Sequence, residues 1–154
     1  MLTRVFPECI DNHYRGRAVA LWLLVPIAFM KVGISLAHIF RADGGAQSVS
    51  TIPLDTYPAG AAQNVIALFA RMGLEQFLLG ALCVVVLLRY RSMIPLMYLL
   101  IVVHDIAYAG IARVKPLALA GTSGARMPAL VLTVLSVSGL ILSLWGEGYK
   151  NQRG

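Results

Sequence analysis

The chain has 154 residues, of which 58% are hydrophobic and only 13% are charged. Soluble domains are about 45–50% apolar and about 25% charged, so this composition excludes an ordinary soluble globular domain. The net charge of +6 does not indicate nucleic-acid binding, because most basic residues lie at chain ends and between apolar runs rather than in one basic patch. We therefore predict an all-α integral membrane protein with a single transmembrane domain over residues 1–154.

Four apolar stretches predict a bundle of four membrane helices, at about residues 18–40, 59–90, 93–112 and 128–145. Each stretch can cross a hydrocarbon core of about 30 Å. Four crossings place both termini on one side of the membrane. That side holds the larger basic set, Arg4, Arg15, Arg17, Arg89, Arg91, Lys150 and Arg153, and the other side holds Arg41, Arg113, Lys115 and Arg126. The bias predicts cytoplasmic termini, and we expect the bacterial cytoplasmic (inner) membrane as the location.

The first apolar stretch carries Lys31, Ser35 and His38 on one helix face, because they are spaced by four and three residues. His38 lies close to the end of the stretch, where we interpret it as an interfacial histidine. Lys31 lies too deep for that interpretation. It is therefore the first candidate for a buried polar site.

The second stretch carries a full cation and a full anion, Arg71 and Glu75, at positions i and i+4. Each charge is costly inside lipid, so we expect the pair to face protein or a water-filled cavity. Gly73 and Gly80 lie on the other side of this helix, since two residues rotate a helix by about 200°. The glycines predict a seam where a neighbouring helix approaches closely.

The third stretch carries Tyr98, Asp105 and Tyr108 along one stripe, with His104 beside it, and we expect this stripe to face the bundle interior. The fourth stretch has no ionisable residue before Glu147. Its small residues, Thr133, Ser136, Gly139 and Ser143, form a packing stripe. We interpret the fourth helix as scaffold.

The polar residues of the first three helices predict one buried layer. Lys31, Glu75 and Asp105 each lie 14 residues from the cytoplasmic arginine that bounds their helix, or about 21 Å into a core of about 30 Å. The predicted layer contains Lys31, Arg71, Glu75, His104 and Asp105, with Tyr98 and Tyr108 as neighbours. Glu75, Asp105 and His104 are the candidate catalytic, proton-exchanging groups. Lys31, Arg71, Tyr98 and Tyr108 are the candidate ligand-binding residues.

Two segments also resemble a known family. The phrase Gly73-Leu74-Glu75-Gln76-Phe77-Leu78-Leu79-Gly80, which continues through a Leu/Val stretch to Arg89, is similar to the second helix of DoxX-like small four-helix membrane proteins. The segment from Lys31 to Phe40 is loosely similar to their first helix. The resemblance implies a four-helix architecture and makes Glu75 the family-type acidic position. It also implies a link to quinone or sulfur redox chemistry in some members, and it does not cover Arg71, His104 or Asp105.

Three functions remain open from the sequence. The first is a pocket in the outer half of the bilayer that binds or acts on a small amphipathic or lipid-like ligand, such as a quinone-type molecule. The second is an accessory or structural subunit of a larger membrane complex. The third is a proton or ion path in an oligomer. The expected partners are membrane lipids, a lipid-like small molecule and further copies or subunits, with no nucleic acid. The sequence specifies no cofactor, predicts no metal site, and leaves open whether the protein is an enzyme.

Overall fold

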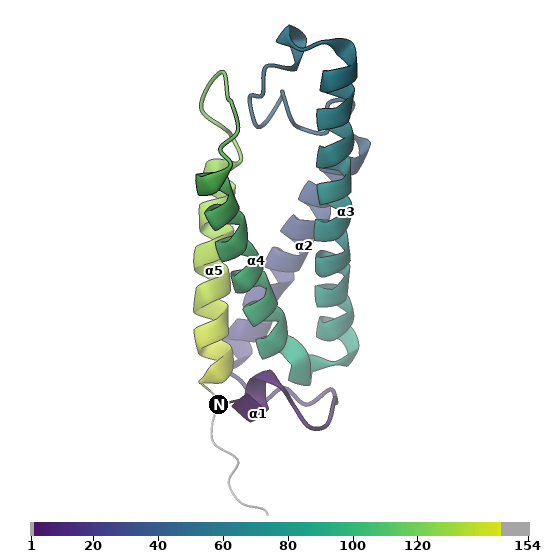
Figure 1. Cartoon of the computed structure of the whole chain (residues 1–154). Coiled ribbons are helices and arrows are strands. Elements are labelled where there is room, and N and C mark those ends of the chain that lie inside the picture. The colour runs from purple at the N-terminus through teal and green to yellow at the C-terminus, as the bar shows by residue number, and fades with distance from the viewer. Residues whose placement is uncertain (1, 146–154) are drawn as a thin grey trace, which may run out of the picture.

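The computed structural model describes residues 2–145, and within that range the chain is all-helical (Figure 1). Four helices are long and apolar enough to cross a membrane, which confirms the predicted all-α fold and its four candidate membrane spans. They are α2 (Ala18–Phe40), α3 (Ala59–Arg89), α4 (Ile94–Val114) and α5 (Arg126–Leu144). The short elements are α1 (Leu2–Val5), η1 (Leu54–Thr56) and η2 (Arg91–Met93). Lys150 and Arg153, two basic residues of the predicted cytoplasmic side, lie outside the described residues.

The start of α2 and the end of α5 lie at the same end of the molecule. The backbone N–H of Arg17 donates to the carbonyl of Leu142 at 3.3 Å. The N-terminal segment also contacts the turn between α3 and α4, because the Asp11 N–H donates to Ser92 Oγ at 3.0 Å. The Ser92 hydroxyl in turn donates to the Asp11 carbonyl at 2.9 Å. These bonds close the end of the bundle where the chain begins.

The tightest helix pair is α2 with α3, and two glycines of α3 make it possible. A Cβ atom on Gly73 would lie 2.7 Å from His38 Cβ, and one on Gly80 would lie 3.0 Å from Val32 Cγ2. Real Cβ atoms essentially never show the first distance, and the second is tighter than nearly all real contacts, so a side chain at either position would force α2 and α3 to shift apart. The predicted glycine seam is therefore confirmed, and its neighbour is α2.

The α5 helix packs against α2 and α4 through small residues. A Cβ atom on Gly139 would overlap the ring of Tyr98, which is fully buried. The Tyr98 hydroxyl donates to the Ala20 carbonyl at 2.5 Å, so one side chain of α4 connects α2 with the glycine surface of α5. The main apolar core surrounds this tyrosine.

The α3 and α4 helices are joined by a very short turn, yet they pack on each other far less than α2 packs on α3. Figure 1 shows α3 beside α2 and α4 beside α5, with the two pairs spreading apart toward the end opposite the N-terminus. The loops at that end hold the pairs together, because the Ala120 N–H donates to the Thr51 carbonyl at 2.8 Å and the Gly124 N–H to the Val49 carbonyl at 2.9 Å. The α3–α4 contact is thus the weakest between long helices that follow each other in the chain.

The loop after α2 is ordered by hydrogen bonds from its own backbone. His38 Nδ1 lies 2.6 Å from the Gly44 carbonyl, which can only accept, so this ring nitrogen carries the proton. The Asp43 carboxylate accepts from the N–H groups of Gly45 and Ser48 at 2.9 and 2.7 Å. Burial raises the pKa of Asp43, but these backbone hydrogen bonds outweigh it and lower the pKa to about 2. His38 is a loop-anchoring histidine at the end of α2.

Candidate functional site

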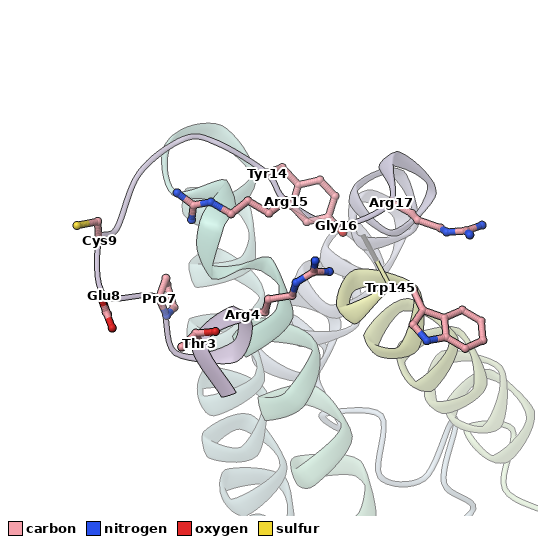
Figure 2. A pocket seen from close by; sticks show the side chains of 10 residues that line it. All are labelled: Thr3, Arg4, Pro7, Glu8, Cys9, Tyr14, Arg15, Gly16, Arg17 and Trp145. Atoms are coloured by element: carbon pink, nitrogen blue, oxygen red, sulfur yellow. The ribbon is translucent and has the colours of Figure 1, made fainter. Parts of the chain in front are cut away.

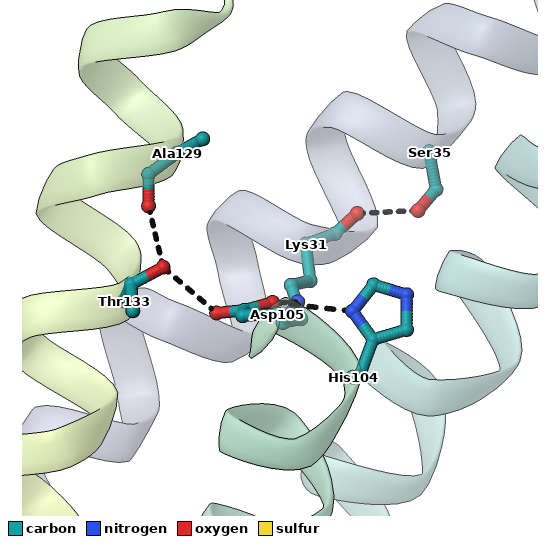
Figure 3. Close-up of polar contacts among 6 residues, drawn as sticks. All are labelled: Lys31, Ser35, His104, Asp105, Ala129 and Thr133. Atoms are coloured by element: carbon teal, nitrogen blue, oxygen red, sulfur yellow. Dashed lines mark hydrogen bonds and ion pairs between the residues drawn. The ribbon is translucent and has the colours of Figure 1, made fainter. Parts of the chain in front are cut away.

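The centre of the candidate site is an ion pair between α2 and α4 (Figure 3). Lys31 Nζ lies 3.5 Å from Asp105 Oδ1, and the two side chains are only 5% and 13% exposed. Lysine is almost never buried to this degree unless it is paired. The two residues that the depth argument placed at one level do meet in the structure.

Asp105 gathers polar groups from two further side chains. His104 Nδ1 lies 3.1 Å from the same Oδ1 atom, and Thr133 Oγ1 of α5 lies 3.2 Å from Oδ2. Because an ionised carboxylate only accepts, Nδ1 of His104 carries the proton and Nε2 remains for another partner. We name Lys31, His104, Asp105 and Thr133 the inner cluster.

The Thr133 hydroxyl has two acceptors within reach and one proton to donate. It lies 3.0 Å from the Ala129 carbonyl as well as 3.2 Å from the Asp105 carboxylate. When Asp105 is ionised, the hydroxyl can donate to it. When Asp105 is protonated, the carboxylic acid can donate to Thr133, whose hydroxyl then donates to Ala129. The hydroxyl can therefore accommodate either protonation state of the carboxyl group.

His104 extends from the inner cluster toward the weakly packed α3–α4 side of the bundle. Its side chain is 37% exposed, whereas Asp105, to which it is bonded, is 13% exposed. The ring stacks on exposed Tyr108 with centroids 6.3 Å apart and planes inclined by 19°. The Tyr108 hydroxyl reaches across to Met72 Sδ of α3 at 3.9 Å. His104 and Tyr108 thus lie on the side of α4 that turns toward α3.

Tyr98, the other predicted ligand-binding tyrosine, lies away from this cluster. It precedes Asp105 by seven residues, or about 10.5 Å of helix. It has no exposed surface, and its hydroxyl already donates to Ala20. The geometry gives Tyr98 a packing role in the core.

The predicted five-member layer does not form, because Arg71 and Glu75 point away from it. Both residues are exposed on the outer side of α3. Within residues 2–145 neither side chain makes an ion pair with Lys31, His104, Asp105 or the other. The expectation that this pair faces the interior of the chain is therefore wrong.

The physical reason is the glycine seam. Gly73 and Gly80 turn toward α2, and residues two positions away on the same helix point roughly opposite. A closed bundle would cover that opposite side with another helix, but α4 packs only weakly on α3. The depth of Glu75 differs as well, since Gly80 rather than Glu75 lies against Lys31. Five residues, or about 7.5 Å of helix, separate those two positions.

Thr133 is the site residue that sequence reasoning missed. Its spacing predicts a place in the small-residue packing stripe of α5, yet it supplies a hydroxyl to Asp105. Ser136 is a second hydroxyl-bearing residue of the same stripe, but its buried hydroxyl has no hydrogen-bond partner in the described structure. Which of two hydroxyls one turn apart meets the carboxylate depends on the rotation of α5, which residue spacing does not determine.

A separate recess of about 1280 Å³ lies at the N-terminal end of the molecule (Figure 2). Its lining is Thr3, Arg4, Pro7, Glu8, Cys9, Tyr14, Arg15, Gly16, Arg17 and Trp145. Burial raises the pKa of Tyr14 to about 12, so this phenol stays neutral at any physiological pH. None of the predicted site residues lines this recess.

The chemistry open to the inner cluster is proton exchange and the binding of a polar head group. With neutral His104 the cluster has no net charge, and with protonated His104 it carries one positive charge, which favours an anion. No group of three or more His, Cys, Asp or Glu side chains that could hold a metal ion occurs in the described part of the chain. Comparison with protein-family models, with curated proteins and with solved structures gives no match for this chain.

Proposed function

We propose that the protein binds, or acts on, a small amphipathic molecule inside the membrane, at the inner cluster. The observation that carries this proposal is the position of His104, which is bonded to a mostly buried carboxylate while its own side chain stays partly exposed. A polar network that only fixed helix register would not need an exposed ionisable group. Ionisable residues inside a membrane are costly, so a cluster of them is by default a hypothesis for a functional site.

The ligand class follows from the groups on offer. His104 Nε2 can accept a hydrogen bond from a hydroxyl, or donate one to a carbonyl or carboxylate when the ring is protonated. The exposed Tyr108 ring beside it offers an aromatic face for an apolar or conjugated body. A molecule with a carbonyl or acid head and an apolar tail, such as a quinone or a fatty acid, would enter from the lipid between α3 and α4.

The test is the content of small molecules in protein purified from membranes in mild detergent. Mass spectrometry of organic extracts should find a carbonyl- or acid-bearing amphiphile in wild type that is depleted in His104→Phe and Asp105→Asn. Arg71→Met is the matched control, because it removes a membrane charge outside the cluster, and it should keep the ligand. Identical extracts from all four proteins would refute the proposal.

The membrane orientation is part of the same proposal. We propose cytoplasmic termini in a bacterial inner membrane, on the basis of the basic residues around the N-terminal end and the α3–α4 turn. An impermeant thiol reagent on intact cells should then miss exposed Cys9 and label Ser48→Cys in a Cys9→Ser background. The DoxX-like resemblance is compatible with this arrangement and with a quinone-type ligand, and it stays an expectation.

A second candidate function is that of a subunit in a membrane assembly. The exposed Arg71 and Glu75 of α3 favour it, because a cation and an anion at this depth need a partner that residues 2–145 do not supply. The two candidates use different faces of the protein and can both hold.

A further inference from the structure

The exposed side of α3 carries one continuous stripe of eight residues. They follow each other at alternating spacings of four and three: Asn64, Leu68, Arg71, Glu75, Leu78, Leu82, Val85 and Arg89. All eight are exposed in the structure. We call this set the outer stripe. A mean spacing of 3.5 residues is the pattern by which two helices wind around each other as a left-handed pair.

Two charges at the middle of the outer stripe separate it from an ordinary lipid-facing surface. Glu75 lies 14 residues, or about 21 Å, from the Arg89 end of α3, which is deep in a hydrocarbon core of about 30 Å. Arg71 lies one turn farther, where its long side chain could extend toward the opposite head groups. A lipid phosphate could satisfy Arg71 in this way, but it would repel Glu75. Lipid alone therefore leaves the carboxylate without a partner.

A second copy of the chain supplies both partners at once. Copies inserted in the same orientation are related by a twofold axis along the membrane normal, so their α3 helices run parallel. Arg71 of one copy then lies one turn, about 6 Å along the axis, from Glu75 of the other, which an extended arginine side chain can span. The same contact occurs twice by symmetry, and the four charges cancel.

We propose that the outer stripe of α3 is a homodimer interface, in which Arg71 of each copy pairs with Glu75 of the other. The leucine and valine positions of the stripe pack along the same seam. Van der Waals packing and polar pairing, rather than a hydrophobic driving force, hold such a contact together in lipid. This inference uses a different face from the inner cluster and does not depend on the proposed ligand.

The interface can be mapped by cysteine cross-linking in membranes, with both native cysteines replaced (Cys9→Ser, Cys83→Ala). Leu82→Cys lies on the outer stripe, and Val84→Cys is its matched control. Both native side chains are exposed, they differ in depth by two residues, and they point about 160° apart. Oxidation should produce a disulfide-linked dimer from Leu82→Cys and little from Val84→Cys. Equal yields, no dimer, or a Leu82→Cys product with a different protein would overturn the proposal.

The charge pairing has its own test, in which two differently tagged copies are expressed together, each also carrying Leu82→Cys. Arg71→Glu copies would bring four carboxylates together, and Glu75→Arg copies four guanidinium groups. Like-charge contacts cost enough to lower each self-cross-link by about tenfold or more. Cross-linking between one copy of each kind should return to the wild-type level. Unchanged self-cross-linking, or failure of the mixed pair while both variants still insert at wild-type yield, would contradict the pairing between copies.

Discussion

Two pairs of opposite charge lie in the membrane-spanning helices of this protein, and they differ in burial and in pairing. Lys31 and Asp105 come from two helices, meet at 3.5 Å and are nearly buried. Arg71 and Glu75 come from one helix, are exposed and do not pair within the described chain. The first pair is satisfied by the fold itself. The second is left for something outside the fold.

The difference shows that the cost of burying charge in lipid constrains a whole assembly rather than a single chain. A charge in a membrane helix must find a partner, but a ligand or another chain can provide it. The inner cluster and the outer stripe of α3 are then the two places where function can be sought.

The largest expected effect is the loss of one member of the inner pair. Asp105→Leu would leave the buried Lys31 ammonium without its counter-charge, and Lys31→Met would leave the carboxylate to His104 and Thr133 alone. Breaking a buried pair from one side typically costs about 3–5 kcal/mol of unfolding free energy. Unfolding of the detergent-solubilised protein by heat or denaturant, followed by circular dichroism, measures this loss.

The double variant Lys31→Met with Asp105→Leu is the control for that prediction. Because no charge is then stranded, its stability should return to within about 1 kcal/mol of wild type. If the double variant were as unstable as the worse single variant, the two side chains would not act as a pair.

Much of this arrangement could be predicted from the sequence, because hydropathy, helix rise and residue spacing are local properties. The four helices, the Gly73–Gly80 seam and the common level of Lys31 and Asp105 follow from them. The rotation of a helix about its own axis does not follow, because it depends on which neighbour packs on it. That is why the hydroxyl of Thr133 is not predicted. Glu75 is predicted inside for another reason, because residue spacing does not show whether a helix covers the side of α3 opposite the glycines.

A smaller effect is expected at the seam that turns Arg71 and Glu75 outward. Gly73→Ala would place a Cβ atom 2.7 Å from His38 Cβ and 3.0 Å from the Ser35 carbonyl. Overpacking of this kind costs about 1–3 kcal/mol. Gly60→Ala on the same helix meets nothing within 4 Å, so it should be neutral or slightly stabilising in the same unfolding assay. If the two substitutions had equal effects, Gly73 would not be needed for the close approach of α2 and α3.

Asp43 provides a water-facing carboxylate for comparison with the two intramembrane ones. Its pKa of about 2 lies below the ordinary value of 3.8, so its stabilisation is complete above about pH 3.8 and is lost as pH falls through about 2. The side chain is partly exposed at the surface, where water screens its charge, so we expect Asp43→Asn to cost only about 0.5–1 kcal/mol of local loop stability at neutral pH. Amide hydrogen exchange at Gly45 and Ser48 should speed up accordingly. Unchanged exchange at both amides would show that the Asp43 carboxylate does not stabilise the loop.

The smallest effect on the isolated chain is expected from the outer pair. Arg71→Met and Glu75→Gln remove exposed side chains that have no partner within the described chain, so the monomer in detergent should change by no more than about 0.5 kcal/mol. The unfolding assay used for Asp105→Leu checks this directly. A loss as large as that of Asp105→Leu would show that Arg71 and Glu75 are paired inside the chain after all.

The most direct test of this division is a distance measurement by solid-state NMR in liposomes. One population of the chain carries ¹⁵N-arginine and the other ¹³C-labelled glutamate, of which the sequence has only three. We predict that the Glu75 carboxyl signal, assigned by its absence in Glu75→Gln, is dephased by arginine nitrogen in the mixed sample. Dilution with unlabelled chain should remove the effect. The absence of dephasing in the mixed sample, together with dephasing in a doubly labelled and diluted chain, would place the Arg71–Glu75 pair within one chain and contradict the proposed dimer.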